Sequence, residues 1–289
     1  MALAWSFNYI AGKIADSHMP AAAVAWFRIL LGGAIFFGIL LALRRRAPLP
    51  GWRDLPVFLL LGATGVAINQ AGFTLSLNYT SVGRVALISA ISPVMVLLMA
   101  WLDRLEPLTW PKFIGMGLAF AGIALLAGEE GLAGHPAALR GDLLALAATV
   151  GLAIFTVACK RVAHRYDALT IGAYSALVGA VIALPFAWKE AARLNWHAVP
   201  WQGWAGMVYM AVFGSVVGYL AFYRLVELLS ASQVASLYYV QPVVATALGV
   251  LLLGEHAGRG FLAAAALVAA GVVIAERSRN RPPSPPRPA

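Results

Sequence analysis

The stretch Val82–Leu102, VGRVALISAISPVMVLLMAWL, contains twenty-one residues and one charged side chain, Arg84. A helix of about 20 apolar residues crosses a hydrocarbon core roughly 30 Å thick. Over all 289 residues, 61% are hydrophobic and 11% charged, and the mean hydropathy is +0.80. Soluble chains are about half apolar and a quarter charged, so an ordinary cytosolic enzyme is excluded. The sequence predicts an all-α polytopic membrane protein, because open sheets leave backbone groups unsatisfied in lipid.

Apolar runs separated by polar or turn-forming residues predict ten transmembrane helices. The first is short, because its fourteen residues cover only about 21 Å of membrane depth. The predicted helices are Ala2–Ala15, Ala21–Leu43, Leu55–Ser76, Val82–Leu102, Trp110–Ala127, Gly141–Lys160, Leu169–Trp188, Gly203–Leu225, Gln233–Leu253 and Gly258–Ala275.

The net charge of +9 and the pI near 10.1 would suggest nucleic-acid binding in a soluble protein. In a membrane protein such an excess reflects Lys and Arg at cytoplasmic helix ends, so we expect no nucleic-acid partner. With the N-terminus inside, fourteen Lys and Arg residues fall on the cytoplasmic side and five on the other. We therefore predict a multi-pass protein of the bacterial inner (plasma) membrane with both termini cytoplasmic. Residues 277–289 are predicted to form a disordered, Pro- and Arg-rich cytoplasmic tail.

The second half of the chain resembles the first. Shifting residues 65–122 by 149 positions aligns twelve identical residues without a gap, including Pro93 with Pro242. A weaker match at a shift of 147 aligns Lys13 with Lys160. These identities indicate an internal duplication.

The predicted repeats cover residues 1–129 and 140–276. Each contains five predicted helices, an odd number, so the second repeat enters the membrane with opposite polarity. Inverted repeats are typical of secondary transporters, in which substrate binds near the midplane and one repeat rocks against the other. The alternative is an old duplication in a protein with a different role.

Several short motifs carry a resemblance to a known family. In the first half they are Trp5-Ser6-Phe7-Asn8, Gly12-Lys13, Arg28, Ala71-Gly72-Phe73, Thr80-Ser81-Val82, Ala86, Ser92-Pro93, Leu102, Glu106, Gly115 and Gly122. In the second half they are Ala221-Phe222-Tyr223, Ser230-Ala231-Ser232, Pro242, Leu251, Gly254-Glu255 and Gly271. With these residues the chain resembles the EamA-type ten-helix members of the drug/metabolite transporter superfamily, most of all the YddG-type amino-acid exporters. The resemblance implies a cavity lined by the third, fourth, eighth and ninth helices, with contributions from the first and sixth.

Ten residues are predicted to bind substrate. Amides and hydroxyls at membrane depth can donate and accept hydrogen bonds, which suits a zwitterion; they are Asn8, Asn69, Ser89, Ser92 and Gln241. Large aromatic rings offer apolar faces to an aromatic substrate; they are Trp5, Phe73, Tyr219, Phe222 and Tyr238. The alternatives are hydrogen bonding between helices for the polar residues and core packing for the aromatic ones.

Two prolines and two cations are predicted to act as hinges or gates. Pro93 and Pro242 each remove a backbone hydrogen bond inside a helix and leave a carbonyl that needs a partner. Lys13 and Arg28 lie toward the outer ends of the first two helices, where they could form an outer gate or contact a substrate carboxylate. The alternatives are a packing kink for the prolines and snorkelling for the cations.

The twelve acidic residues and five histidines fall in loops or near predicted helix ends. A proton relay needs such a group inside the membrane, so we predict a uniporter. No Ser–His pair, clustered metal ligands or P-loop stands out. We therefore predict no enzyme activity, no catalytic residue, no metal and no cofactor.

These inferences predict a transporter that exports small metabolites, chiefly aromatic and other neutral amino acids, by alternating access through an uncharged central cavity. The expected partners are a small-molecule substrate and the lipid bilayer, and we expect a monomer. The alternatives are transport of drugs or of phosphorylated metabolites such as nucleotide sugars. The last would need several cations to converge on the cavity.

Overall fold

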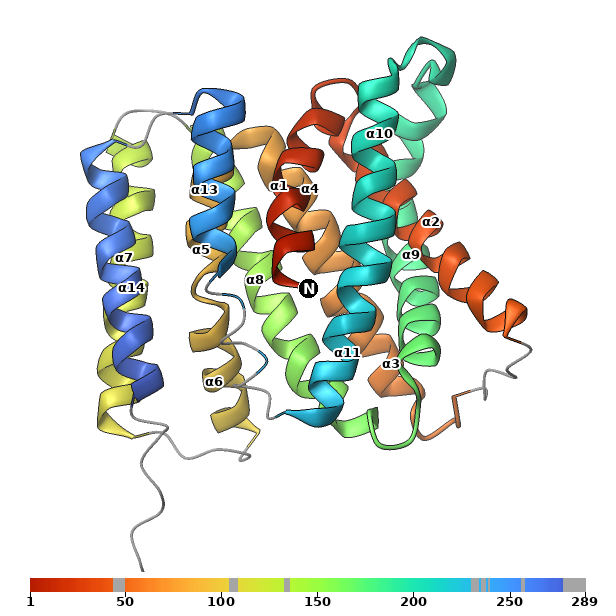
Figure 1. The fold of residues 1–289 in the computed structure, drawn as a ribbon, viewed down its shortest axis with the longest axis horizontal. Coiled ribbons are helices and arrows are strands. Elements are labelled where there is room, and N and C mark those ends of the chain that lie inside the picture. The colour runs from red at the N-terminus through yellow and green to blue at the C-terminus, as the bar shows by residue number, and fades with distance from the viewer. Residues whose placement is uncertain are drawn as a thin grey trace, which may run out of the picture.

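The computed structural model describes residues 1–43, 50–103, 109–132, 136–229, 234, 238, 240–255 and 258–277, and the regular elements in these ranges are all helical (Figure 1). Within them, six helical stretches are long and apolar enough to cross a membrane, namely Ala21–Ala42, Leu55–Tyr79, Val82–Leu102, Pro136–Val162, Ala168–Arg193 and Trp201–Leu228. Shorter apolar helices cover Trp110–Leu125, Gln241–Leu253 and Arg259–Ala275. The chain is a polytopic helical membrane protein. All but the first residue of the predicted tail, residues 277–289, lies outside the described residues.

The helices follow the predicted apolar runs to within a few residues at most of their ends. Those of the first half are α1 (Ala2–Asp16), α2 (Ala21–Ala42), α3 (Leu55–Leu61), η1 (Gly62–Ala71), α4 (Gly72–Tyr79), α5 (Val82–Ser89), α6 (Ser92–Leu102) and α7 (Trp110–Leu132). Those of the second half are α8 (Pro136–Val162), α9 (Ala168–Arg193), η2 (Trp196–Ala198), α10 (Trp201–Tyr209), η3 (Met210–Val217), α11 (Gly218–Leu228), α13 (Val240–Leu253) and α14 (Arg259–Arg277). The start of the predicted ninth helix, at Gln233, falls on residues that are not described.

Large apolar side chains cover the outside of the bundle. Among the most exposed are Phe186, Val181, Leu251, Leu262 and Val243, each with 59–78% of its surface accessible. Such an outer surface would be unstable in water but suits contact with lipid tails.

A π-helical segment occurs in both halves, at corresponding places. The helical stretch Leu55–Tyr79 contains η1, and the stretch Trp201–Leu228 contains η3. A shift of 149 places η1 on residues 211–220, which overlap η3. Short π segments interrupt the regular backbone ladder and are frequent at functional sites. They bring an irregular stretch to the middle of each of these helices.

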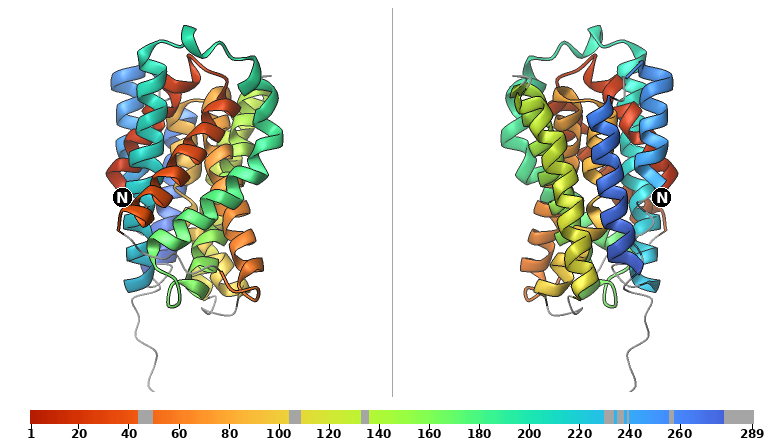
Figure 2. Two further views of the ribbon diagram at one scale, coloured as in Figure 1. Left: turned by 90° about the vertical axis from the view of Figure 1, so that its right-hand side faces the viewer. Right: turned by 90° about the vertical axis from the view of Figure 1, so that its left-hand side faces the viewer.

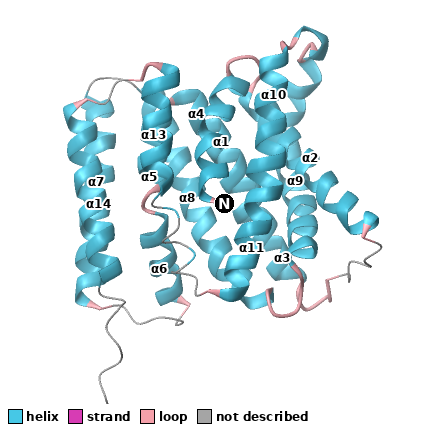
Figure 3. Cartoon of the chain, viewed as in Figure 1, coloured by secondary structure: helices cyan, strands magenta, loops and turns pink. Residues whose placement is uncertain are grey.

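The stretch Val82–Leu102 breaks between α5 and α6, where Figure 3 shows a short loop. Pro93 has no N–H to donate to the carbonyl of Ser89, four residues earlier. The hydroxyl of Ser92 donates to this carbonyl instead, at 2.7 Å. The freed carbonyl predicted from Pro93 therefore has a partner, and the break costs less than an unsatisfied group in lipid would.

Successive helices run alternately up and down in the view of Figure 1. Figure 2 shows α7 and α14 side by side on one flank, and α2 crossing α9 on the opposite flank. Small residues bring α7 and α14 together, because a Cβ added at Gly115 would overlap the carbonyl oxygen of Gly271. Between these two flanks lie α1, α4, α5, α8 and α11, which position the site described next.

Candidate functional site

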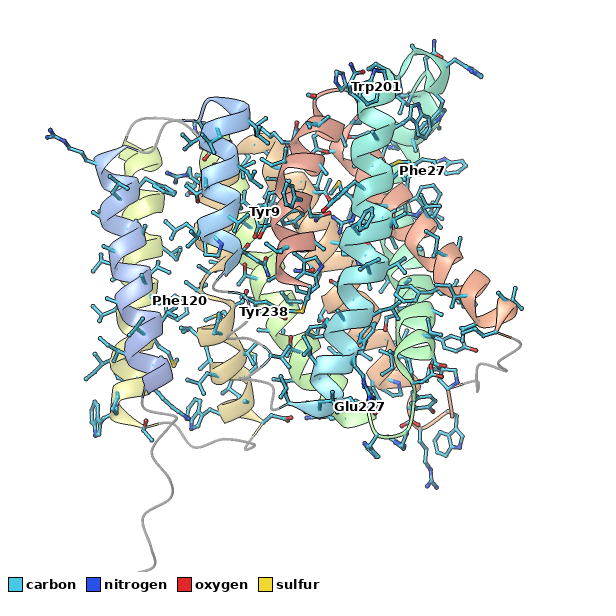
Figure 4. The ribbon with its side chains drawn as sticks, viewed as in Figure 1. Tyr9, Phe27, Phe120, Trp201, Glu227 and Tyr238 are labelled. Carbon is cyan, nitrogen blue, oxygen red and sulfur yellow. The ribbon has the colours of Figure 1, made fainter. Side chains whose placement is uncertain are left out.

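A small cavity lies in the middle of the bundle. Its volume is about 60 Å³, which holds a few water molecules at roughly 10–15 Å³ each. Figure 4 places two of its lining residues, Tyr9 and Tyr238, at mid-height, between Trp201 near the upper end and Glu227 at the lower end. The lining residues are Trp5, Asn8, Tyr9, Arg28, Asn69, Gln70, Phe73, Val85, Ser89, Ser92, Ala145, Ala148, Thr149, Leu152, Gly214, Tyr219, Tyr238 and Gln241.

The structure brings nine of the ten predicted substrate-binding residues to this central cavity. The exception is Phe222, which is fully buried and packs behind Trp5 and Phe155. Among the predicted gate or hinge residues, Arg28 lines the cavity, so the prediction of an uncharged cavity is wrong. The other three lie elsewhere: Lys13 in an upper cavity, Pro242 in an apolar groove beside α14, and Pro93 buried in α6.

The lining also contains residues that the prediction missed, chiefly Tyr9 and four residues of α8. The α8 residues are Ala145, Ala148, Thr149 and Leu152, which are too small or too apolar to stand out in a membrane helix. A signal for one of them does exist. The shift of 147 that aligns Lys13 with Lys160 also aligns Trp5 with Leu152, and both line the cavity.

Aromatic rings form one wall of the cavity. The Trp5 ring centroid lies 5.4 Å from that of Tyr219 and 5.7 Å from that of Tyr238, and Tyr9 and Phe73 are 4.8 Å apart. The Trp5 indole nitrogen donates to the carbonyl of Gly214 at 2.8 Å, which holds the ring against η3. This wall offers an apolar, polarisable surface to a substrate side chain.

The close approach of α1 to η3 and α11 depends on a glycine. A Cβ added at Gly218 would overlap the indole nitrogen of Trp5. The indole ring of Trp5 on α1 can therefore pack against α11 only because residue 218 has no side chain.

Neutral polar groups join Arg28 in a hydrogen-bonded network on the other side. The guanidinium donates to Thr74 Oγ1 at 3.2 Å and to Ser215 Oγ at 3.4 Å. Ser215 Oγ in turn donates to Gln70 Oε1 at 3.0 Å. Nearby, Asn69 Nδ2 donates to the carbonyl of Ala148 at 2.9 Å. The network crosses from α2 to η1, α4 and η3, so it links elements from both halves of the chain.

Lys13 ties α1 to the upper end of α4. Its ammonium donates to the carbonyl of Leu77 at 2.6 Å and to that of Thr80 at 2.9 Å. Leu77 lies in the last turn of α4 and Thr80 directly follows the helix, a position where a cation is favoured by the helix dipole. Lys13 lines an upper cavity of about 560 Å³ together with residues 78–81, Arg84 and Glu255.

Charged groups also hold the start of α5 at the upper end. The carboxylate of Glu255 accepts from the backbone N–H of Val82 at 2.7 Å and of Gly83 at 3.0 Å. One residue further, Arg84 forms an ion pair with Asp142 of α8, and both side chains are buried. Asp142 was expected near a helix end, but α8 begins at Pro136, so this residue lies in its second turn.

At the lower end of the bundle, Lys160 makes a contact equivalent to that of Lys13. Lys160 of α8 donates to the carbonyl of Leu229, which directly follows α11. Lys160 corresponds to Lys13 at the shift of 147, and Leu229 corresponds to Thr80 at the shift of 149. The two lysines therefore tie equivalent helices of the two halves, at opposite ends of the bundle.

Comparison with known proteins shows to which family the chain belongs. The model of the EamA-like transporter family matches residues 1–128 and 139–276. The chain belongs to the EamA-like transporter family. The predicted resemblance is thereby confirmed, and with it the prediction that the chain is a transporter, since the family's members are transporters and not enzymes.

Several relatives resemble this EamA-like transporter over most of their length. An uncharacterized transporter of Bacillus subtilis (strain 168), YvbV, is 27% identical over 277 residues, which cover 95% of this chain and 88% of the relative. A probable terminal-alkyne amino-acid exporter of Streptantibioticus cattleyicolor is 32% identical, covering 82% of this chain and 79% of the relative. An S-adenosylmethionine/S-adenosylhomocysteine transporter of Chlamydia trachomatis serovar L2 is 25% identical, covering 93% and 85%. A crystal structure at 21% identity shares the fold, with a TM-score of 0.68 over 97% of this chain and 96% of the other.

Proposed function

We propose that this EamA-like transporter exports small metabolites, chiefly aromatic and other neutral amino acids, by alternating access through the central cavity. The observation that carries the proposal is the lining itself. It combines a wall of aromatic rings with amides, hydroxyls and the guanidinium of Arg28, and the described lining residues include no acidic residue and no histidine. Such a surface suits a zwitterion with an apolar side chain. The similarity to a probable amino-acid exporter points the same way.

We further propose ten transmembrane helices arranged as two inverted five-helix repeats, residues 1–129 and 140–276. Three correspondences support this arrangement: the π segments η1 and η3, the helix starts just before Pro93 and Pro242, and the lysine contacts at opposite ends. The alternating helix directions in Figure 1 are those that an inverted repeat requires. The excess of Lys and Arg supports a cytoplasmic lower end, and we propose that both termini lie on that side of a bacterial inner membrane.

The two lysine contacts support alternating access. The central cavity, at about 60 Å³, is too small for an amino acid, so in the proposed cycle the helices around it separate before substrate enters. Release of Lys13 from Leu77 and Thr80 opens the outer path, and release of Lys160 from Leu229 opens the inner path. We propose uniport because the described lining residues include no acid and no histidine. We further propose that the transporter acts as a monomer.

The experiment is counterflow of labelled phenylalanine in liposomes that contain the purified protein. We expect competition by unlabelled tryptophan, methionine and threonine, and none by a nucleotide sugar or a lipophilic cation. Adenosylmethionine belongs among the competitors because one relative transports it. Competition by phosphorylated compounds alone would instead support the alternative transporter of nucleotide sugars and contradict the proposal.

A further inference from the structure

The guanidinium of Arg28 is a charged group buried in the middle of the bundle. The residue is 3% exposed and lies on the wall of the central cavity. Its hydrogen bonds go to the neutral hydroxyls of Thr74 and Ser215, and its Nε has no partner in the described part of the chain. Taking an ion out of water costs several kcal/mol unless an opposite charge compensates. Neutral hydroxyls at 3.2 and 3.4 Å compensate it only in part.

No acidic side chain among the described residues forms an ion pair with Arg28. Asp16 lies at the end of α1, yet neither of its carboxylate oxygens has a hydrogen-bond partner there. Asp16 lines a separate cavity at the upper end with Ser17, His18 and Glu190, and its carboxylate stabilises the Arg28 charge electrostatically, without a hydrogen bond to it. The cation at the central cavity therefore keeps unused hydrogen-bond donors for a second anion.

One edge of the Arg28 guanidinium has unused donors that suit a carboxylate. Nε is buried and has no hydrogen-bond partner in the described part of the chain, and the adjacent NH2 group makes a single long bond to Ser215. These two nitrogens lie on one edge of the planar fork, which donates two parallel hydrogen bonds to a carboxylate. The Phe73 ring, with its centroid 5.9 Å from the guanidinium carbon, adds an apolar surface beside the group.

An acceptor without a donor lines the same cavity. The side-chain oxygen of Asn8 is buried and has no hydrogen-bond partner in the residues that the structure describes. An ammonium group supplies the donor that this oxygen lacks. The aromatic rings of Trp5 and Tyr219 lie in the same lining. The cavity therefore has a cationic part, an acceptor part and an apolar wall.

We propose that Arg28 binds the carboxylate of the transported molecule, so that the transporter selects compounds with a free carboxylate and rejects their amides, esters and decarboxylated amines. The proposal rests on the proposed function, since it requires the central cavity to be the transport site. It assigns to Arg28 a specificity that neither the family nor the relatives specify.

The test compares four related compounds as competitors of labelled phenylalanine in counterflow: phenylalanine, phenylalaninamide, phenethylamine and 3-phenylpropionate. For the wild-type protein we expect half-inhibition by the amide and the amine to need at least about tenfold more compound than by phenylalanine. The acid without an amine should compete better than either. Arg28→Gln should raise the half-saturation concentration of phenylalanine at least about tenfold while changing inhibition by the amide about twofold or less. Arg28→Lys, which keeps the charge and loses the fork, should fall between.

Arg224→Gln is the matched control, because Arg224 is exposed and pairs with Glu227 at the lower end of α11. If phenylalaninamide competes as well as phenylalanine in the wild-type protein, the assignment to Arg28 is wrong while the proposed function stands. If none of the four compounds competes and phenylalanine itself is not exchanged, the proposed function has failed. Should Arg28→Gln not yield folded protein, the wild-type series and Arg28→Lys still decide the question.

Discussion

Replacing Lys13 by methionine should favour the state that is open at the upper, outer end. The ammonium makes two hydrogen bonds to carbonyls of the α4 end, at 2.6 and 2.9 Å. A hydrogen bond with a charged partner contributes about 1.5–3 kcal/mol. In the open state the lysine bonds to water instead, so the net loss on substitution is of that order for the pair. Since about 1.4 kcal/mol corresponds to tenfold, the outer-open population should rise about 10- to 100-fold.

Labelling of a single cysteine in the central cavity measures this shift. The chain has one cysteine, Cys159, which is fully buried and is replaced by alanine for the assay. Ala148→Cys introduces a thiol into the cavity lining on α8. A membrane-impermeant thiol reagent is added outside sealed, right-side-out vesicles, and the labelling rate is compared with and without Lys13→Met. The rate should rise about 10- to 100-fold with the substitution.

Lys160→Met is the matched variant, because Lys160 makes the equivalent contact to Leu229 at the lower end. This substitution should raise the rate of labelling from the inner side, and the rate from the outer side should stay unchanged or fall. The reasoning is refuted if Lys13→Met leaves outer labelling unchanged in folded protein, or if both substitutions raise labelling from the same side.

Three other expectations follow from the packing and charges. Gly218→Ala should displace Trp5, lower the free energy of unfolding by about 1–3 kcal/mol in thermal unfolding and weaken phenylalanine counterflow. Gly117→Ala is the control, because the space around its Cβ is open, and it should change neither stability nor counterflow. Equal effects of the two substitutions would show that the Trp5 contact is unimportant. Arg84→Gln should cost about 3–5 kcal/mol because it removes the ion-pair partner of the buried Asp142 carboxylate, and adding Asp142→Asn should recover part of the loss; a strictly additive double variant would contradict this. An imposed pH gradient should change phenylalanine uptake by about twofold or less, because no acid or histidine is among the described lining residues; a several-fold rise would exclude uniport.

The helices could be located from hydropathy, because a lipid-exposed helix must be apolar over its whole length. The stretch Val82–Leu102 shows both the strength and the limit of that signal. Its outer bounds agree with the prediction, and Pro93 correctly marked an irregularity. The π segments η1 and η3 could not be found in this way, because a π turn changes the backbone spacing without requiring a change in composition.

Site residues could be predicted from the sequence where their side chains are of a type that is rare in membrane helices, and not where they are of a common type. Asn8, Asn69 and Gln241 stood out because amides are costly in lipid, and all three line the cavity. Ala145 and Ala148 could not stand out, since small residues are common wherever membrane helices pack together. Phe222 was predicted to bind substrate but does not line the cavity, although its repeat partner Phe73 does. Phe222 packs against Phe155 instead. The residue that corresponds to Phe155 in the first half, at the shift of 147, is the much smaller Asn8.

The sharpest test of the central claim is to fill the cavity and measure counterflow. Ala148 lines the cavity on α8, and its neighbour Ala147 is exposed on the outside of the same helix. We expect Ala148→Trp to abolish counterflow of labelled phenylalanine while folded protein persists, and Ala147→Trp to leave it within about twofold of the wild-type rate. Undiminished counterflow in folded Ala148→Trp, or equal loss in both variants, would contradict a substrate path through the central cavity.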